Sequence, residues 1–216
     1  EALGAIGNLE VLDILKQYST DPVIEVAETC QLAVRQLEWL QQCGGDPVPA
    51  GPYGSVDPAP PAEERDVGRL REALLDEARP LFDRYRAMFA LRDAGGEEAA
   101  LALAEGLRCG SALFRHKIGC VLGQLQHKAA VPQLRAALAR ADESPMVKYE
   151  CAKALGAIAA ACQAALRAHA DDTERAVRES YAVVALALLR DLYEQETGAA
   201  FQYAYELQRL CPAAAR

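Results

Sequence analysis

The sequence predicts an all-α protein, a solenoid of stacked helical hairpins in two parts joined by a linker rich in Pro and Gly. Hydrophobic residues make up 51% of the chain but aromatic residues only 6%. Ala and Leu supply most of the apolar surface, which favours closely packed helices over sheets. The segment 113–125, LFRHKIGCVLGQL, is similar to the segment 146–158, MVKYECAKALGAI, which lies 33 positions later. Weaker similarities to these segments occur at 84–95 and 1–7. A period of one helical hairpin, within the range of roughly 20 to 50 residues, is typical of stacked repeats.

The first 43 residues predict about one and a half hairpins. Residues 1–7 close a helix, and residues 9–18 form a short amphipathic one. Asp21 is a suitable N-cap with Pro22 in the first helical position, so we expect a helix from there up to a Gly-Gly pair. Because the chain starts inside an apolar helix and without Met, we expect residues 1–43 to be the remnant of a longer N-terminal half.

A change in composition separates this part from the rest of the chain. Six of the eleven prolines and four glycines lie between positions 44 and 61. Such a segment cannot be helical, because proline lacks the backbone donor and glycine favours turns. We therefore expect residues 44–62 to be an extended, partly stiff linker.

Four helix pairs are predicted over residues 63–198. The expected helices are 65–78 with 80–92, 97–108 with 111–126, 132–140 with 145–160, and 162–170 with 172–195. One hairpin is too narrow to bury its own apolar stripe, so these pairs must stack on one another. Gly119, Gly123 and Gly156 lower helix propensity, which indicates closely approaching helices at these positions. The tail, 199–216, is either a short helix or disordered.

Charge and cysteine usage narrow the class of protein. The net charge is −8 and the basic residues are scattered, which gives no support for nucleic-acid binding. The seven cysteines are odd in number and form no CxxC pair, as expected of free thiols in a reducing, cytoplasmic compartment. No apolar run approaches the roughly 20 residues needed to span a membrane. HExxH, Walker and nucleophile-elbow motifs are absent from the sequence.

The repeated motif carries a family resemblance. LGQL at 122–125 and LGAI at 155–158 are each preceded by a two-residue polar position. Further matching stretches are LGAIG at the start, DPVIEVAETCQLAVRQLEWL, VDPAPPAEERDVGRLREALLDE, RYRAMFALRDAGGEEAALALAEGL, and FRH with VLGQLQH. Over nearly its whole length the chain resembles the deoxyhypusine hydroxylase family.

The resemblance implies a HEAT-repeat fold and an iron-dependent monooxygenase. This family converts deoxyhypusine to hypusine on a translation initiation factor, which is the expected partner, with no nucleic acid or membrane involved. Two irons are held by four His-Glu pairs at the starts of inner helices. Imidazole nitrogen and carboxylate oxygen suit iron, and neighbouring helix positions point about 100° apart, so several repeats must converge to close a site.

Carried over residue by residue, the ligand set is incomplete. The third pair keeps His116 but has Lys117 in place of Glu, and the fourth keeps Glu150 but has Tyr149 in place of His; the first two pairs would precede Glu1. An ammonium group repels a metal dication, and a phenol with a pKa of about 10 is a poor ligand. We expect iron to be absent or weakly bound and the chain to be inactive. The alternative function is a non-catalytic HEAT-repeat module that binds proteins.

Two other interpretations of His116 involve no iron. Without its partner it is expected to pack or form hydrogen bonds on the inner face. His116 and Cys120 share a helix face four residues apart, which is a permitted geometry for two metal ligands. Because the sequence offers no third or fourth ligand, the favoured interpretation is that His116 and Cys120 are neighbours in a core.

Overall fold

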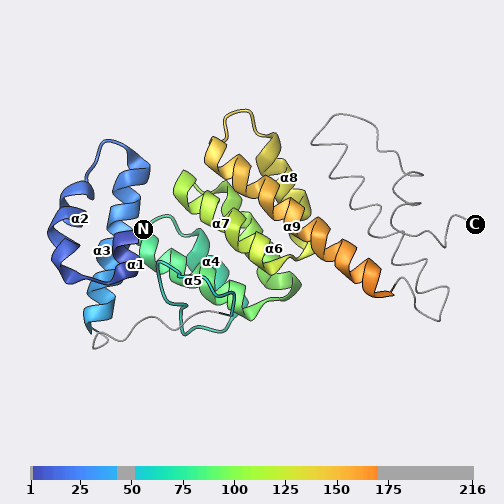
Figure 1. The fold of residues 1–216 in the computed structure, drawn as a ribbon, viewed down its shortest axis with the longest axis horizontal. Helices are drawn as coiled ribbons and strands as arrows, with labels where there is room; N and C mark the ends of the chain where they lie inside the picture. Colours follow the sequence, from blue (N-terminus) through green and yellow to red (C-terminus); the bar gives the residue numbers. More distant parts are fainter. Residues whose placement is uncertain (1, 43–51, 170–216) are drawn as a thin grey trace, which may run out of the picture. The chain divides into compact units, whose positions relative to one another are not determined.

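A computed structural model describes residues 2–42 and 52–169, and the regular elements in this part of the chain are all helical (Figure 1). The helices are α1 (Ala2–Ile6), α2 (Leu12–Tyr18), α3 (Ile24–Gln42), α4 (Val67–Leu75), α5 (Leu81–Ala94), α6 (Gly96–Glu105), α7 (Ala112–Leu125), α8 (Val131–Ala139) and α9 (Pro145–His169). Three 3-10 turns join them: η1 (Leu9–Val11), η2 (Gly106–Arg108) and η3 (Lys128–Ala130). The chain forms two compact units, 1–154 and 155–216. None of the described helices is both long and apolar enough to cross a membrane.

The N-terminal helices form a hairpin with a small core of its own. Helices α1 and α2 both pack on α3, around the buried side chains of Leu15, Ala33, Val34 and Leu37. The predicted cap is displaced: the Asp21 carboxylate accepts the backbone N–H of Val23 at 2.8 Å, and α3 begins only at Ile24. Asp21 therefore stabilises the turn before the helix, and the prediction of Pro22 as its first residue was wrong.

Three further hairpins follow, made by α4 with α5, α6 with α7, and α8 with the start of α9. The first helices of the pairs contact one another, and α5 contacts α7, as stacked repeats require. Side-chain caps fix the helix starts, since the Asp66 carboxylate accepts the N–H of Arg69 and the Ser111 hydroxyl accepts that of Phe114. Ser111 therefore begins its helix as predicted. Between repeats, Tyr85 lies edge-on against Phe114 with ring centroids 5.6 Å apart.

Glycines set the distance between α7 and α9. A Cβ on Gly119 would lie 3.2 Å from the Cβ of Glu150, and one on Gly123 would lie 3.2 Å from the Cα of Ala154. Close approach is therefore confirmed at both positions. At Gly156 no atom of the described residues lies within 4 Å of the position of a Cβ, so close approach is not found there in the described part of the chain.

The second part of the predicted linker is ordered against the helices. Residues 52–61 contain no helix, as their prolines predict, but residues 57–60 are buried. Asp57 accepts a salt bridge of 2.8 Å from Arg92, whose side chain is fully buried on α5. The backbone carbonyl of Asp57 also accepts a hydrogen bond of 3.3 Å from Gln36 on α3. One residue thus connects the N-terminal hairpin, the linker and the first repeat after it.

Helix α9 is longer than predicted. It runs unbroken from Pro145 to His169, whereas the sequence predicts one helix that ends at residue 160 and another that begins at 162. The residues around this point are mainly Ala, with no Gly or Pro, so nothing in the local sequence favours a break. The last predicted helix, 172–195, and the tail lie outside the described residues.

Replacing Arg92 with Ala is expected to lower the free energy of unfolding by about 3–5 kcal/mol, because Asp57 is left as a buried, unpaired charge. Urea unfolding followed by circular dichroism measures the change. The control is Arg71→Ala, which removes an exposed pair with Glu105 and should lower the free energy of unfolding far less. Equal effects of the two substitutions would contradict the assignment.

Replacing Gly123 with Ala is expected to destabilise the protein by about 1–3 kcal/mol, since the new methyl group meets the backbone of Ala154. Gly156→Ala is a matched control in α9. There the methyl group meets no described atom within 4 Å, so the gain in helix propensity should raise stability by up to about 1 kcal/mol. Urea midpoints that shift in the same direction for both variants would show that close approach does not explain Gly123.

Candidate functional site

The two retained ligand positions come together between adjacent helices. His116 lies on α7 and Glu150 on α9, with 3.7 Å between the His116 Nε2 and Glu150 Oε1 atoms. Glu150 is only 7% exposed. Gly119 allows this approach, because it lies one turn from His116 and has no Cβ to hold the Glu150 backbone away. The geometry at this point is therefore set by the packing of two helix backbones.

Lys153, which is not one of the predicted site residues, already neutralises the Glu150 carboxylate. Lys153 Nζ donates a hydrogen bond of 3.1 Å to the same Glu150 Oε1 atom that faces His116. This hydrogen bond, together with the negative charge of Glu150, raises the pKa of Lys153. Lys153 also lies over the Tyr149 ring, 5.6 Å from its centroid, and Tyr149 is 65% exposed. The spacing of three residues between Glu150 and Lys153 was a signal available in the sequence.

Lys117 lines a hollow that includes neither His116 nor Glu150. It lines a space of about 210 Å³ together with Gln36 and Asp57. Other lining residues are Ala2, Ala5, Val56 and Pro58. His116 and Lys117 thus serve two environments, as expected for neighbouring helix positions that point about 100° apart.

Cys120, one turn beyond His116, is a partly buried thiol between charges of both signs. Its pKa is raised, chiefly by burial; Lys117 and Lys153 oppose this rise and Glu150 adds to it. A raised pKa keeps the thiol protonated at neutral pH, and the thiolate is the form that binds metals. In the part of the chain that the structure describes, no group of three or more His, Cys, Asp or Glu side chains is placed to hold a metal ion.

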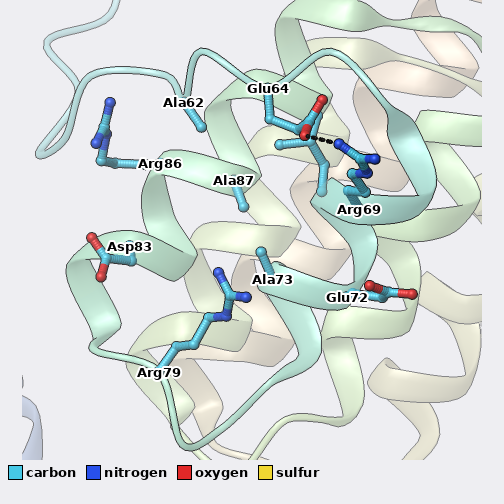
Figure 2. Close-up of a pocket in the computed structure, with 10 residues that line it drawn as sticks. Ala62, Glu64, Arg69, Glu72, Ala73, Arg79, Asp83, Arg86 and Ala87 are labelled. Atoms are coloured by element: carbon cyan, nitrogen blue, oxygen red, sulfur yellow. Dashed lines mark hydrogen bonds and ion pairs between the residues drawn. The ribbon is translucent and has the colours of Figure 1, made fainter.

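A larger hollow lies elsewhere, between α4, α5 and residues 62–64 (Figure 2). It measures about 480 Å³, and Ala73 and Ala87 form part of its lining. Its charged lining residues are Glu64, Arg69, Glu72, Arg79, Asp83 and Arg86, three of each sign. Glu64 and Arg69 pair at 3.4 Å. This balance of charges gives the hollow no preference for a cation or an anion, and it includes neither His116 nor Glu150.

Comparisons with known proteins agree on the family and the fold. Residues 100–187 match the model of HEAT repeats, and residues 83–109 match that of the PBS lyase HEAT-like repeat. Deoxyhypusine hydroxylase from Homo sapiens is 78% identical over 211 residues, covering 97% of this chain and 68% of that protein. The protein of the same name from Mus musculus is 72% identical, and that from Drosophila pseudoobscura pseudoobscura is 50% identical.

A solved structure of human deoxyhypusine hydroxylase in complex with glycerol is also similar. It aligns with a TM-score of 0.71 and 80% sequence identity, covering 89% of this chain and 65% of that one. The chain therefore spans about two thirds of the length of the proteins it resembles.

Thiol reactivity provides a test of burial near the candidate site. Burial raises the pKa of Cys151 to about 11, and Cys151 is fully buried, whereas Cys30 is partly exposed. At neutral pH iodoacetamide should therefore modify Cys30 well before Cys151, as measured by peptide mass spectrometry. Denatured protein, in which both thiols react alike, is the control. Equal rates in the folded protein would show that Cys151 is accessible.

Proposed function

The chain belongs to the deoxyhypusine hydroxylase family, and on that basis we propose that it binds a deoxyhypusine-bearing translation initiation factor without hydroxylating it. The high identity to deoxyhypusine hydroxylases from several animals supports the choice of partner. The HEAT-repeat stack supplies helical faces suited to recognising a protein. The cysteine pattern supports a cytoplasmic setting. The division into an N-terminal remnant, a linker and a C-terminal half stays a prediction.

The observation that carries this proposal is the pairing of Glu150 with Lys153. Iron held by protein side chains alone commonly uses two imidazoles and one carboxylate. The four carried-over positions provide His116 and Glu150, and one oxygen of Glu150 already accepts the Lys153 ammonium at 3.1 Å. Lys117 adds a positive charge where the family resemblance implies a carboxylate. These residues do not fit a di-iron centre, and we derive no reaction step through one.

The second candidate function is the family reaction itself, the iron-dependent hydroxylation of deoxyhypusine. Two observations favour it. The identity to human deoxyhypusine hydroxylase is 78%, and the helices still bring His116 and Glu150 within 3.7 Å of each other. The scaffold thus keeps the spacing of a ligand pair, and the two functions differ in whether metal is retained.

Iron retention distinguishes the two functions. After anaerobic loading with ferrous iron and dialysis against a chelator, we expect far less than one iron per chain by elemental analysis. Incubation with deoxyhypusine-bearing factor and dioxygen should leave the mass of the factor unchanged, without the addition of one oxygen atom. Calorimetry should nevertheless detect a complex. Stoichiometric iron after dialysis, or an oxygenated product, would overturn the proposal, and so would the absence of a complex.

A reverting variant makes the test sharper. The combination of Lys117→Glu, Tyr149→His and Lys153→Ala removes two ammonium groups and adds an imidazole and a carboxylate, so it should retain more iron than the original chain. The matched control, Lys128→Glu, changes charge at an exposed position outside the site. Equal iron contents in the reverting and control variants would show that Lys117, Tyr149 and Lys153 do not limit metal binding.

A further inference from the structure

A hollow on the side of the stack formed by α6 and α8 differs in character from those described above. It measures about 390 Å³. Its apolar lining residues are Ala104, Leu107, Pro132, Ala136 and Ala137. Its polar lining residues are Arg108, Gln133 and Arg140, and none of the described residues that line it is Asp or Glu. An apolar surface edged by guanidinium groups is a distinctive setting in a chain whose net charge is −8.

The carboxylates near this hollow are already used by other side chains. Arg71 holds both oxygens of Glu105 with hydrogen bonds of 2.8 and 2.5 Å. Arg108 therefore interacts with Glu105 only through its charge, which helps to lower the pKa of Glu105 after the larger effect of Arg71.

The Glu143 carboxylate is likewise bound by neighbouring groups. It is buried, and it accepts hydrogen bonds from Arg115, the closest at 2.6 Å, and from the backbone N–H of Ser144. It also forms a salt bridge with Arg140. The carboxylates of Glu105 and Glu143 are thus paired with Arg71, Arg115 and Arg140, whereas Arg108 forms no hydrogen bond or salt bridge within the described residues.

Gln133 supplies a second, independent observation. Its side-chain oxygen, Oε1, is buried and has no hydrogen-bond partner in the described structure. A buried acceptor without a donor is unfavourable, so a ligand that brings an N–H group would satisfy it. Inorganic phosphate or a simple carboxylate ion has no N–H to donate. A peptide carries both groups, a backbone N–H and the carboxylate of an acidic side chain.

We propose that this hollow binds an acidic peptide segment of a partner protein. Arg108 pairs with a carboxylate of the peptide, together with the N–H groups of Arg140 that are not bound to Glu143 or to the Leu107 carbonyl. The Gln133 side chain turns its buried Oε1 atom toward the hollow to accept a backbone N–H, and the alanine-rich surface receives a small apolar side chain. This site is independent of the positions assigned to the metal ligands and of the function proposed above.

The test uses the full chain and a fluorescent peptide of alternating Glu and Ala. Fluorescence anisotropy should show binding that weakens as salt rises, since charges at the surface are screened within about 8 Å at physiological ionic strength. A peptide with Gln in place of each Glu should bind at least about tenfold more weakly, a difference of about 1.4 kcal/mol. Equal affinity for the two peptides would overturn the proposal.

Variants assign the contacts. Arg108→Gln should lower the affinity for the Glu peptide about tenfold, and Arg108→Lys should lower it less because the charge remains. Gln133→Leu should also weaken binding. The matched control, Arg79→Gln, changes a guanidinium in the other hollow (Figure 2) and should leave binding unchanged. Thermal melts followed by circular dichroism establish that each variant is folded, and Arg108, being exposed, should tolerate both changes.

Two further outcomes would overturn the acidic-peptide assignment. If inorganic phosphate displaces the peptide at comparable concentrations and Gln133→Leu has no effect, the hollow is a simple oxyanion site. If sedimentation shows self-association that Arg108→Gln abolishes, the occupant is a second copy of the chain. Persistence of peptide binding in excess phosphate, by a protein that sediments as a monomer, would support the proposal.

Discussion

The buried pair of Arg92 and Asp57 is the interaction on which the arrangement of the first compact unit depends. Arg92 is surrounded by Asp57, Asp93 and the rings of Tyr53 and Phe89, with no exposure of its side chain. A guanidinium in such a place is favourable only when its partners are held in position. Asp57 is held because its carbonyl also accepts a hydrogen bond from Gln36 on α3. A segment that composition describes as a linker is thereby a structural element of the core.

The packing of the helices also fixes the geometry of the candidate site. Helix α7 begins at the Ser111 cap and packs on α5, and its Gly119 and Gly123 allow α9 to approach closely. His116 and Glu150 therefore lie at a distance fixed by the backbone. What the family resemblance leads one to expect at these positions is a negative, metal-binding surface. The side chains present instead form an internal ion pair, in which the Lys153 ammonium neutralises Glu150.

Much of the fold follows from local sequence signals, and what does not follow depends on contacts between distant residues. The helix start near residue 111, the hairpin period and the close approach at Gly119 and Gly123 were predicted because each follows from the sequence of one helix or of its repeat. The displaced start of α3 depends on which amide Asp21 binds, and the unbroken α9 shows that an alanine-rich junction need not be a turn. The burial of Asp57 was not predictable, since its partner lies thirty-five positions further along the chain, at Arg92. At the candidate site, the identities of the four carried-over positions follow from the sequence, and the spacing of Glu150 and Lys153 permits a pair, but only the structure shows that Lys153 binds the Glu150 oxygen that faces His116.

The exposure of Tyr149 and Lys153 has a consequence for how such a protein changes over time. Tyr149 is 65% exposed and the Lys153 side chain 59% exposed, so substitutions at either position disturb little of the packed interior. The stack tolerates variation there because buried Arg92 and the close contacts at Gly119 and Gly123, which stabilise it, lie at other positions. Substitutions at Tyr149 and Lys153 should therefore leave the fold intact. The charge around Glu150 can therefore be changed through exposed neighbours, without altering the buried contacts that hold the helices together.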